Sequence, residues 1–190
     1  NGTCNDFDEV TVNFWENPTA AAAGADIFQC NNTTFVMAAN VPTVGTGTWT
    51  QTAGPAVTIT NVNSATTTVT GLAAGAGVVT LRWTISNGTC TPSFDEVDIR
   101  NDVQPVANAG AGGDVCGIGV GNPFTFTGVA SVGTGTWTQQ SGPGVSTFGN
   151  ANLATTTVSV NAYGSYVYRW TEVNGTCNDF DEVTVNFWEN

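Results

Sequence analysis

NGTCNDFDEVTVNFWEN, residues 1–17, recurs without a change as residues 174–190, which sets a period of 173 residues (174 − 1). Within it EVTVNFW alternates apolar and polar side chains, which predicts a strand with one apolar face. That face carries Val10, Val12 and Phe14 in the first copy and Val183, Val185 and Phe187 in the second. A lone strand cannot bury its apolar face. We therefore expect the first copy to complete a domain whose other strands precede residue 1, so that the chain is one repeat plus an overlap.

The composition is typical of an extracellular all-β protein. Hydrophobic residues make up 41% of the chain and aromatic residues 10%, which is enough for real cores, whereas only 9% of residues are charged. The net charge of −12 argues against nucleic acid or an anionic membrane as a partner. The sequence contains no apolar run of the length that a membrane helix needs. We expect an extracellular or cell-surface location.

Two modules, residues 18–102 and 103–190, carry the same motifs in the same order. VGTGTWTQ, ATTTV, RWT, NGTC and FDEV occur in both, 86 to 89 residues apart. Gly, Pro and Asn divide each module into short strands, expected in the first at about 19–28, 33–40, 46–52, 56–60, 66–71, 77–86 and 94–101. This pattern predicts an all-β fold of two tandem immunoglobulin-like β-sandwich domains, part of a longer repeat array.

Four tryptophans are predicted to form the cores of the two sandwiches. Trp83 and Trp170 alternate onto the apolar face of the sixth strand of their modules. Trp49 and Trp137 are expected on the third strand, in the facing sheet. The tryptophans of each module would then meet between the two sheets.

The module openings resemble those of a known family. PTAAAAGAD at 18–26 and PVANAGAGGD at 105–114 resemble the P-x-A-x-AG-x-D opening of PKD domains, and the shared motifs resemble PKD-like, immunoglobulin-like repeats of giant bacterial surface proteins. At Trp49 and Trp137 the W-D-F-G-D-G segment of animal-type PKD domains is replaced by W-T-Q-x-x-G-P. The resemblance implies a secreted, tandem β-sandwich of the kind used in adhesins and surface fibres, with no catalytic residues.

The cysteines allow two disulfide patterns. One repeat has four, because Cys4 is the copy of Cys177, and an even number in a secreted β-rich chain favours disulfides. Sequence spacing suits bonds inside each module, Cys30–Cys90 and Cys116–Cys177. Sandwich topology suits junctional bonds instead, since it puts the two cysteines of one module at opposite poles. Cys30 would then reach Cys177, and Cys116 would reach Cys90 of the following repeat.

Metal and glycan sites are weaker predictions. Asp95, Glu96, Asp181 and Glu182 offer oxygen ligands to calcium, although solvated charge that keeps fibres apart explains them as well. N-x-T sequons mark candidate glycosylation sites, which are equally explained as turn residues. They begin at Asn1, Asn31, Asn32, Asn87 and Asn174.

The sequence predicts a structural role rather than an enzymatic one. It contains no histidine, no lysine and no nucleophile or phosphate-loop motif, so we expect no catalysis and no cofactor beyond the weak calcium sites. We expect a repeat unit of a long extracellular fibre, stalk or filament whose partners are copies of itself. The alternative is an adhesin or carbohydrate-binding repeat that holds glycans. Separate subunits linked by donating residues 1–17 to a neighbour are a variant of the fibre.

Overall fold

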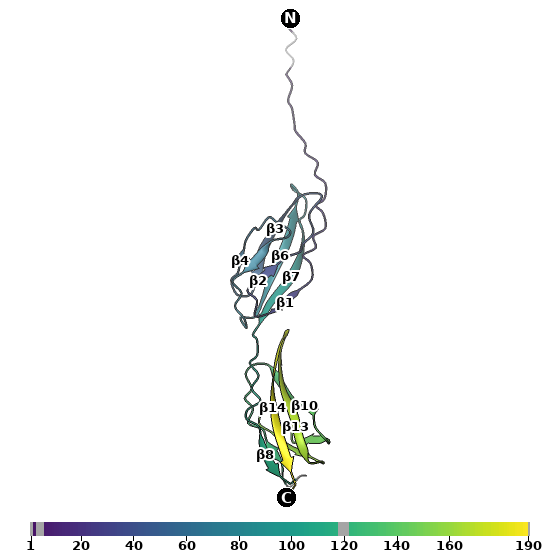
Figure 1. The fold of residues 1–190 in the computed structure, drawn as a ribbon. Helices are drawn as coiled ribbons and strands as arrows, with labels where there is room; N and C mark the ends of the chain where they lie inside the picture. Colours follow the sequence, from purple (N-terminus) through teal and green to yellow (C-terminus); the bar gives the residue numbers. More distant parts are fainter. Residues whose placement is uncertain (1, 3–5, 118–121, 190) are drawn as a thin grey trace. The chain divides into compact units, whose positions relative to one another are not determined.

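The computed structural model describes residues 2, 6–117 and 122–189, and all regular secondary structure in them is β (Figure 1). The first seven strands are β1 (Ile27–Cys30), β2 (Thr34–Val36), β3 (Thr46–Ala53), β4 (Thr58–Ile59), β5 (Thr68–Thr70), β6 (Val78–Ser86) and β7 (Ser93–Asp102). The next seven are β8 (Gly113–Cys116), β9 (Phe124–Thr125), β10 (Thr134–Ser141), β11 (Ser146–Phe148), β12 (Thr157–Val160), β13 (Gly164–Asn174) and β14 (Cys177–Trp188).

One sheet topology occurs twice. The order β1-β7-β6-β3 in a four-stranded sheet and β2-β5-β4 in a three-stranded one is matched by β8-β14-β13-β10 and β9-β12-β11. The first strand of each set pairs in parallel with the last, β1 with β7 and β8 with β14, whereas the other pairs are antiparallel. The predicted pair of tandem immunoglobulin-like β-sandwiches is confirmed.

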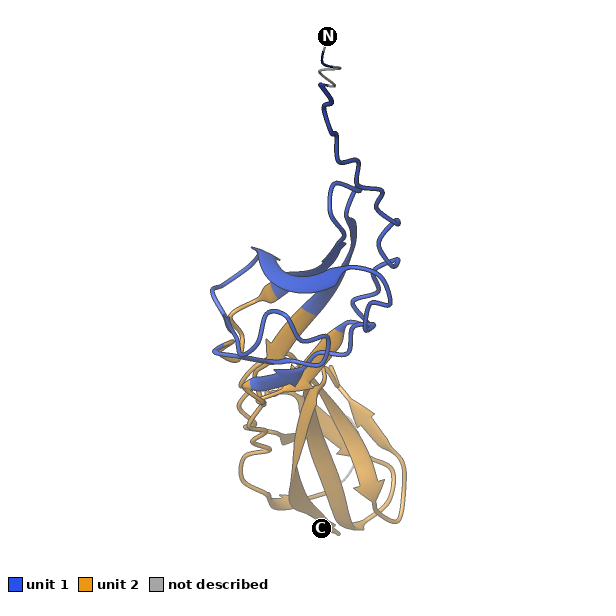
Figure 2. Cartoon of the chain, turned by 90° about the horizontal axis from the view of Figure 1, so that it is seen from above, with its two compact units in different colours: residues 1–26, 34–71, 79–98 blue, residues 27–33, 72–78, 99–190 orange. Residues whose placement is uncertain are grey.

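The chain divides into two compact units whose bounds interleave (Figure 2). Unit 1 comprises Asn1–Asp26, Thr34–Gly71 and Val79–Asp98. Unit 2 comprises Ile27–Thr33, Leu72–Val78 and Ile99–Asn190. Unit 2 therefore contains β1 and the end of β7 as well as β8 to β14. The module boundary between residues 102 and 103 stays a prediction from sequence.

The first predicted strand, residues 19–28, is wrong over most of its length, because β1 covers only its end. In unit 1 the backbone N–H of Ala21 donates to Oγ of Ser93 over 2.9 Å. The N–H of Ala23 donates to Oδ2 of Asp95 over 2.7 Å. Side chains of the neighbouring strand thus take the hydrogen bonds that a backbone ladder would otherwise take.

The four core tryptophans are buried, but their arrangement differs from the expected one. Trp49 and Trp83 are directly paired neighbours in one sheet, with ring centroids 5.2 Å apart. Trp137 and Trp170 are paired in the same way, 5.4 Å apart. The expectation that Trp49 and Trp137 come from the facing sheet is wrong, because β3 pairs with β6 and β10 with β13. Each pair is a cross-strand contact.

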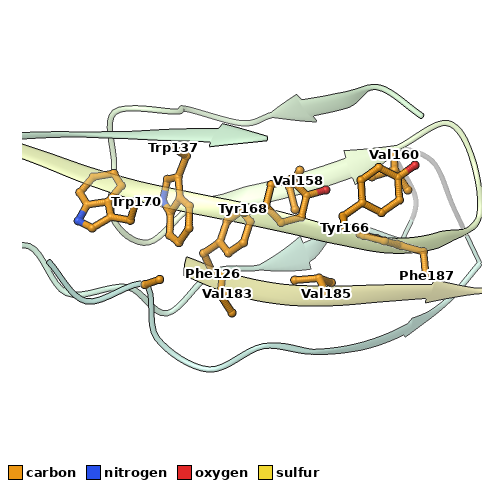
Figure 3. Close-up of a cluster of buried hydrophobic side chains, with 11 residues drawn as sticks. Phe126, Trp137, Val158, Val160, Tyr166, Tyr168, Trp170, Val183, Val185 and Phe187 are labelled. Atoms are coloured by element: carbon orange, nitrogen blue, oxygen red, sulfur yellow. The ribbon is translucent and has the colours of Figure 1, made fainter. Parts of the chain in front are cut away.

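The core of unit 2 is largely aromatic (Figure 3). The ring of Phe126 stacks on Trp137 with centroids 3.9 Å apart, and Tyr168 meets Phe126 edge-on at 5.1 Å. Burial raises the pKa of Tyr168 to about 12, and its hydroxyl shares a hydrogen bond of 2.8 Å with that of Ser146. A tyrosine can be buried here because its only polar group has a partner.

The duplicated 17-residue stretch lies in two different environments. In the second copy residues 177–187 of β14 pair with β13, and Val185 and Phe187 are completely buried. In the first copy residues 6–17 form no strand (Figure 1). The side chains of Val12 and Phe14 are 63% and 94% exposed. Because the sequences are identical, the partner strand alone decides the difference. The first copy therefore has the sequence of a sandwich strand without the sheet.

Truncating the same residue in the two copies should have opposite outcomes. We expect Phe187→Ala to lower the free energy of unfolding by about 3–5 kcal/mol, because it leaves a cavity in the core of unit 2. Phe14→Ala should change it by less than about 0.5 kcal/mol. Urea unfolding at low protein concentration measures both. Equal losses for the two variants would show that the first copy is packed in solution.

Candidate functional site

The turn between β13 and β14, residues 174–177 with the sequence NGTC, holds the end of β7 in unit 2. The side-chain amide Nδ2 of Asn174 donates to the carbonyl of Val103 over 2.9 Å. Both the backbone N–H and the hydroxyl of Thr176 donate to Oδ2 of Asp102, over 2.8 and 3.1 Å. We call this set of interactions the NGTC contact. It fixes one turn against the point where the chain leaves β7.

A disulfide between Cys30 and Cys177 closes the NGTC contact inside unit 2. The Cα atoms of the two cysteines are 5.0 Å apart. Cys30 is the last residue of β1 and lies opposite Asp102 in the parallel pairing with β7. The residue after it, Asn31, donates its backbone N–H to the Asp102 carbonyl over 2.9 Å. Of the two disulfide patterns that the sequence left open, this is the junctional one.

The alternative, Cys30–Cys90 with Cys116–Cys177, is wrong for this structure. Within unit 2, Cys116 lies opposite Trp188, the last residue of β14, whereas Cys177 is its first residue. A strand of twelve residues is about 35 Å long, and a disulfide needs Cα atoms within about 7 Å. Cys90 and Cys116 are free thiols. Cys4 lies outside the described residues.

Asp102 is the charged centre of the contact and is only 7% exposed. Arg100 donates to it through Nε over 2.7 Å and through Nη2 over 3.2 Å. The guanidinium of Arg100 holds the pKa of Asp102 below its usual value, and the hydrogen bonds from Thr176 lower it further against the opposing effect of burial. Arg100 also lies over the ring of Phe28 on β1, 4.3 Å from its centroid. These interactions keep the carboxylate ionised and directed at the turn.

A second NGTC contact occurs in unit 1, between residues 87–90 and the end of the first 17-residue copy. Nδ2 of Asn87 donates to the Glu16 carbonyl over 2.7 Å. The thiol of Cys90 donates to the carbonyls of Glu16 and Trp15, over 3.4 and 3.6 Å. Gly88 lies directly beneath the ring of Trp15. Residues 15–16 thus take the place in unit 1 that residues 102–103 take in unit 2.

Glycine is required in both turns for two reasons. Gly88 has φ 54° and Gly175 has φ 57°, in the left-handed region that other residues rarely adopt. A Cβ atom on Gly88 would overlap the ring of Trp15, and one on Gly175 would overlap the carboxylate of Asp102. The asparagine and glycine of the motif therefore serve the contact as well as the turn.

Two predicted calcium ligands bind the backbone of the module openings instead. Oδ2 of Asp95 accepts the N–H of Ala23, as described above, and Oδ2 of Asp181 accepts the N–H of Ala109 over 2.9 Å. The part of the chain that the structure describes contains no group of three or more His, Cys, Asp or Glu side chains that could hold a metal ion. Calcium binding at these residues stays a prediction.

The other two calcium candidates form exposed ion pairs. Glu96 pairs with Arg82 over 2.9 Å, and Glu182 pairs with Arg169 over 2.7 Å. Both pairs lie at the same position of their sheets, and each arginine also covers a phenylalanine ring. Exposed pairs of this kind contribute at most about 1 kcal/mol.

The candidate glycosylation sites fall into two groups. The side-chain amides of Asn87 and Asn174 are donors in the NGTC contacts, so a glycan on either nitrogen would interfere with the contact. Asn31 and Asn32 are exposed at the end of β1. Asn1 lies outside the described residues. Glycosylation stays a prediction for all five.

Sequence reasoning missed the role of the NGTC turn and of Asp102. It treated the asparagine of NGTC as a glycan acceptor or a turn residue. One signal was available. NGTC occurs three times, at residues 1–4, 87–90 and 174–177, each time before a predicted last strand.

Comparison with known proteins shows the fold. No family model matches the chain, and no curated protein sequence matches it. Domains 3–5 of the extracellular part of Drosophila OTK are similar, with TM-score 0.61 and 11% identity over 90% of this chain and 60% of that one. Sidekick-1 immunoglobulin domains 1–5 give TM-score 0.59 and 11% identity over 92% and 40%. Titin domains I67–I69 give 0.53 and 12% over 90% and 66%.

These similarities establish a tandem of immunoglobulin-like domains. The chain spans between 40% and 66% of the length of these three structures. The described residues include no helix long and apolar enough to cross a membrane.

The NGTC contact in unit 2 should weaken at acid pH. Because the pKa of Asp102 is lowered by folding, its contribution is present above the carboxylate's ordinary value of 3.8 and is lost as the pH falls through the lowered value. We expect Asp102→Asn to cost about 1.5–3 kcal/mol at about pH 6, and much less at about pH 2. Urea unfolding at both pH values measures this. Asp6→Asn, at an exposed position, is the control, and a cost for Asp102→Asn that does not change with pH contradicts the expectation.

The disulfide should stabilise unit 2 strongly. Cys30→Ser removes a cross-link that spans 147 residues, and we expect a loss of about 2–5 kcal/mol in the free energy of unfolding. Cys90→Ser, which removes a free thiol, should lose less than about 1 kcal/mol. Chemical denaturation without reductant compares the two, and adding reductant should lower the wild type to the level of Cys30→Ser.

Proposed function

We propose that the chain is a structural repeat of a long extracellular fibre, stalk or filament, in which tandem β-sandwiches are joined in series. The observation that carries this proposal is the NGTC contact. It occurs once with the end of β7 and once with the end of the first 17-residue copy. In both cases an NGTC turn contacts the segment that connects its module to the preceding one. Such a contact can recur at every module of an array.

The repeat in sequence matches the repeat of the contact. Trp15 and Glu16 are the copies of Trp188 and Glu189, since residues 1–17 and 174–190 are identical. The contact of Asn87 with Glu16 therefore represents the contact of one repeat with the end of the repeat before it. An array of this kind grows in one dimension, because each module interacts only with its two neighbours. The partners of a repeat are copies of itself.

Two features support an extracellular location. The Cys30–Cys177 disulfide is stable in an oxidising compartment and is rare in the cytosol. The net charge of −12 makes neighbouring filaments repel each other, which favours separate filaments over aggregates. The sequence resemblance to PKD-like repeats of giant bacterial surface proteins agrees with this role.

The exposed apolar residues of the first copy fit the same role. The core of unit 2 contains Val183, Val185 and Phe187. Their copies in the first stretch are Val10, Val12 and Phe14. In an array the first copy occupies the β14 position of the preceding repeat, either as part of one continuous chain or as a strand donated by a separate subunit. The chain length in native material separates the two forms. The adhesin alternative, with glycans or calcium as ligands, stays a prediction from sequence.

Concatenated chains test the proposal. We expect chains built by appending copies of residues 18–190 to form rods in electron micrographs, with a length that increases by a constant step per repeat. Asn87→Ala together with Asn174→Ala in every repeat should make the rods bend, because the NGTC contacts lose their side-chain donors. Asn178→Ala, one residue beyond the second turn, is the matched control. Collapsed particles without a constant step in the unaltered chains would refute the fibre.

A further inference from the structure

Cys116 has the same position on its strand as Cys30. Both are the last residue of a short first strand that pairs in parallel with the end of the last strand, Cys30 opposite Asp102 and Cys116 opposite Trp188. The residue after each cysteine donates its backbone N–H to the carbonyl of that partner. For Asn31 and Asp102 the distance is 2.9 Å, and for Gly117 and Trp188 it is 2.8 Å. The backbone that presents the two cysteines is therefore the same.

Cys90 has the same position in its turn as Cys177 has in the second turn. Each is the last residue of an NGTC turn, and each sulfur lies next to a backbone carbonyl, that of Asp102 for Cys177 and that of Trp15 for Cys90. The sulfur of Cys177 is 3.5 Å from the Asp102 carbonyl oxygen, and that of Cys90 is 3.6 Å from the Trp15 carbonyl oxygen. In unit 2 this position brings Cys177 to Cys30. In unit 1 the matching sulfur is a free thiol.

The duplicated sequence connects the two halves of this comparison. Trp15 is the copy of Trp188, so the residue beside Cys90 in unit 1 is the residue beside Cys116 in unit 2. When residues 174–190 of one repeat stand in the place of residues 1–17 of the next, Trp188 brings Cys116 to Cys90. Asp102 brings Cys30 to Cys177 in the same way, at a Cα separation of 5.0 Å. That separation is in the normal range for a disulfide.

We propose that Cys116 of each repeat forms a disulfide with Cys90 of the next repeat. This inference rests on the proposed function, since it needs consecutive repeats. Both thiols are reachable, Cys116 being exposed and Cys90 half-buried. In the reaction the two thiols each lose one proton and together lose two electrons as the S–S bond forms. A disulfide oxidant such as oxidised glutathione takes up both the protons and the electrons, and its own S–S bond breaks to give two thiols.

With this bond, both kinds of junction contain a disulfide. The junction between residues 102 and 103 has Cys30–Cys177, and the junction between consecutive repeats has Cys116–Cys90. The second junction lacks the ion pair and the threonine hydrogen bonds of Asp102, because tryptophan stands at that position. Its noncovalent contact includes the hydrogen bond from Asn87 and the packing of Trp15 on Gly88. A disulfide compensates for the missing charge.

A chain of two repeats tests the bond directly. Residues 1–190 are followed by a second copy of residues 18–190. Both variants also contain Cys4→Ser, because the chain has no preceding repeat whose Cys30 could pair with Cys4. The test variant has Cys90→Ser in the first copy and Cys116→Ser in the second, which leaves Cys116 of the first repeat and Cys90 of the next. The control variant has Cys116→Ser in the first copy and Cys90→Ser in the second. It retains Cys90 of the first repeat and Cys116 of the second, which do not meet at the junction. Both variants contain the same number of thiols.

Both chains are refolded in a mixture of reduced and oxidised glutathione, denatured, treated with N-ethylmaleimide and weighed by mass spectrometry. We expect the test variant to take up no label and the control variant to take up two. Peptide mapping of the same samples shows whether both Cys30–Cys177 bonds have formed, which confirms that the conditions oxidise this protein. Two labels on the test variant with both Cys30–Cys177 bonds closed would overturn the proposal. No label on either variant would overturn it too, because the bond would not be specific for consecutive repeats.

Failure of this bond is distinguishable from failure of the fibre. The rods expected for concatenated chains are observed by microscopy and depend on the noncovalent NGTC contact as well. Rods together with two labels on the test variant would support the proposed fibre and refute only the proposed disulfide. Collapsed particles would remove the fibre itself.

Discussion

The parallel pairing of a very short first strand with the end of the last strand is the constraint on which the rest of this structure depends. It makes β1 end beside Asp102 and β8 end beside Trp188, where the chain leaves each sandwich. A cysteine at the end of the first strand is thereby placed at the exit of its own domain rather than inside it. That single placement explains why the observed disulfide links the end of β1 to the start of β14, and why Cys116 and Cys177 are too far apart to bond.

Much of the fold could be predicted from sequence because it follows from local patterns. Alternation and turn residues predicted the positions of six of the first seven strands, although β2 and β4 are shorter than the predicted 33–40 and 56–60. The buried tryptophans followed from the same alternation. The first strand could not be predicted, because the N–H groups of Ala21 and Ala23 are satisfied by side chains about 72 residues away. The pairing of Trp49 with Trp83 in one sheet depends on strand order, which alternation does not encode.

The candidate site was predictable only in part, for a related reason. Cysteine spacing and the expected sandwich topology left two disulfide patterns open, and the observed pairing of β1 with β7 decides between them. Arg100 and Asp102 are two residues apart and share a face of β7, but the role of Asp102 also depends on Thr176, and no spacing in the sequence relates Thr176 to it. The duplicated stretch makes the limit plain, since one sequence is a buried strand at β14 and an exposed segment at residues 6–17.

The Cys30–Cys177 bond also decides how the chain carries tension. When the two ends of the chain are pulled, force passes from Cys30 through the sulfur atoms to Cys177, so the residues between them lie outside the load path. Those residues include the strands β2 to β13, which can lose their hydrogen bonds without letting the chain lengthen. Only the segments before Cys30 and after Cys177 extend under load. In the fibre proposed above, tension would therefore pass through a covalent bond and not through the hydrogen bonds of β2 to β13.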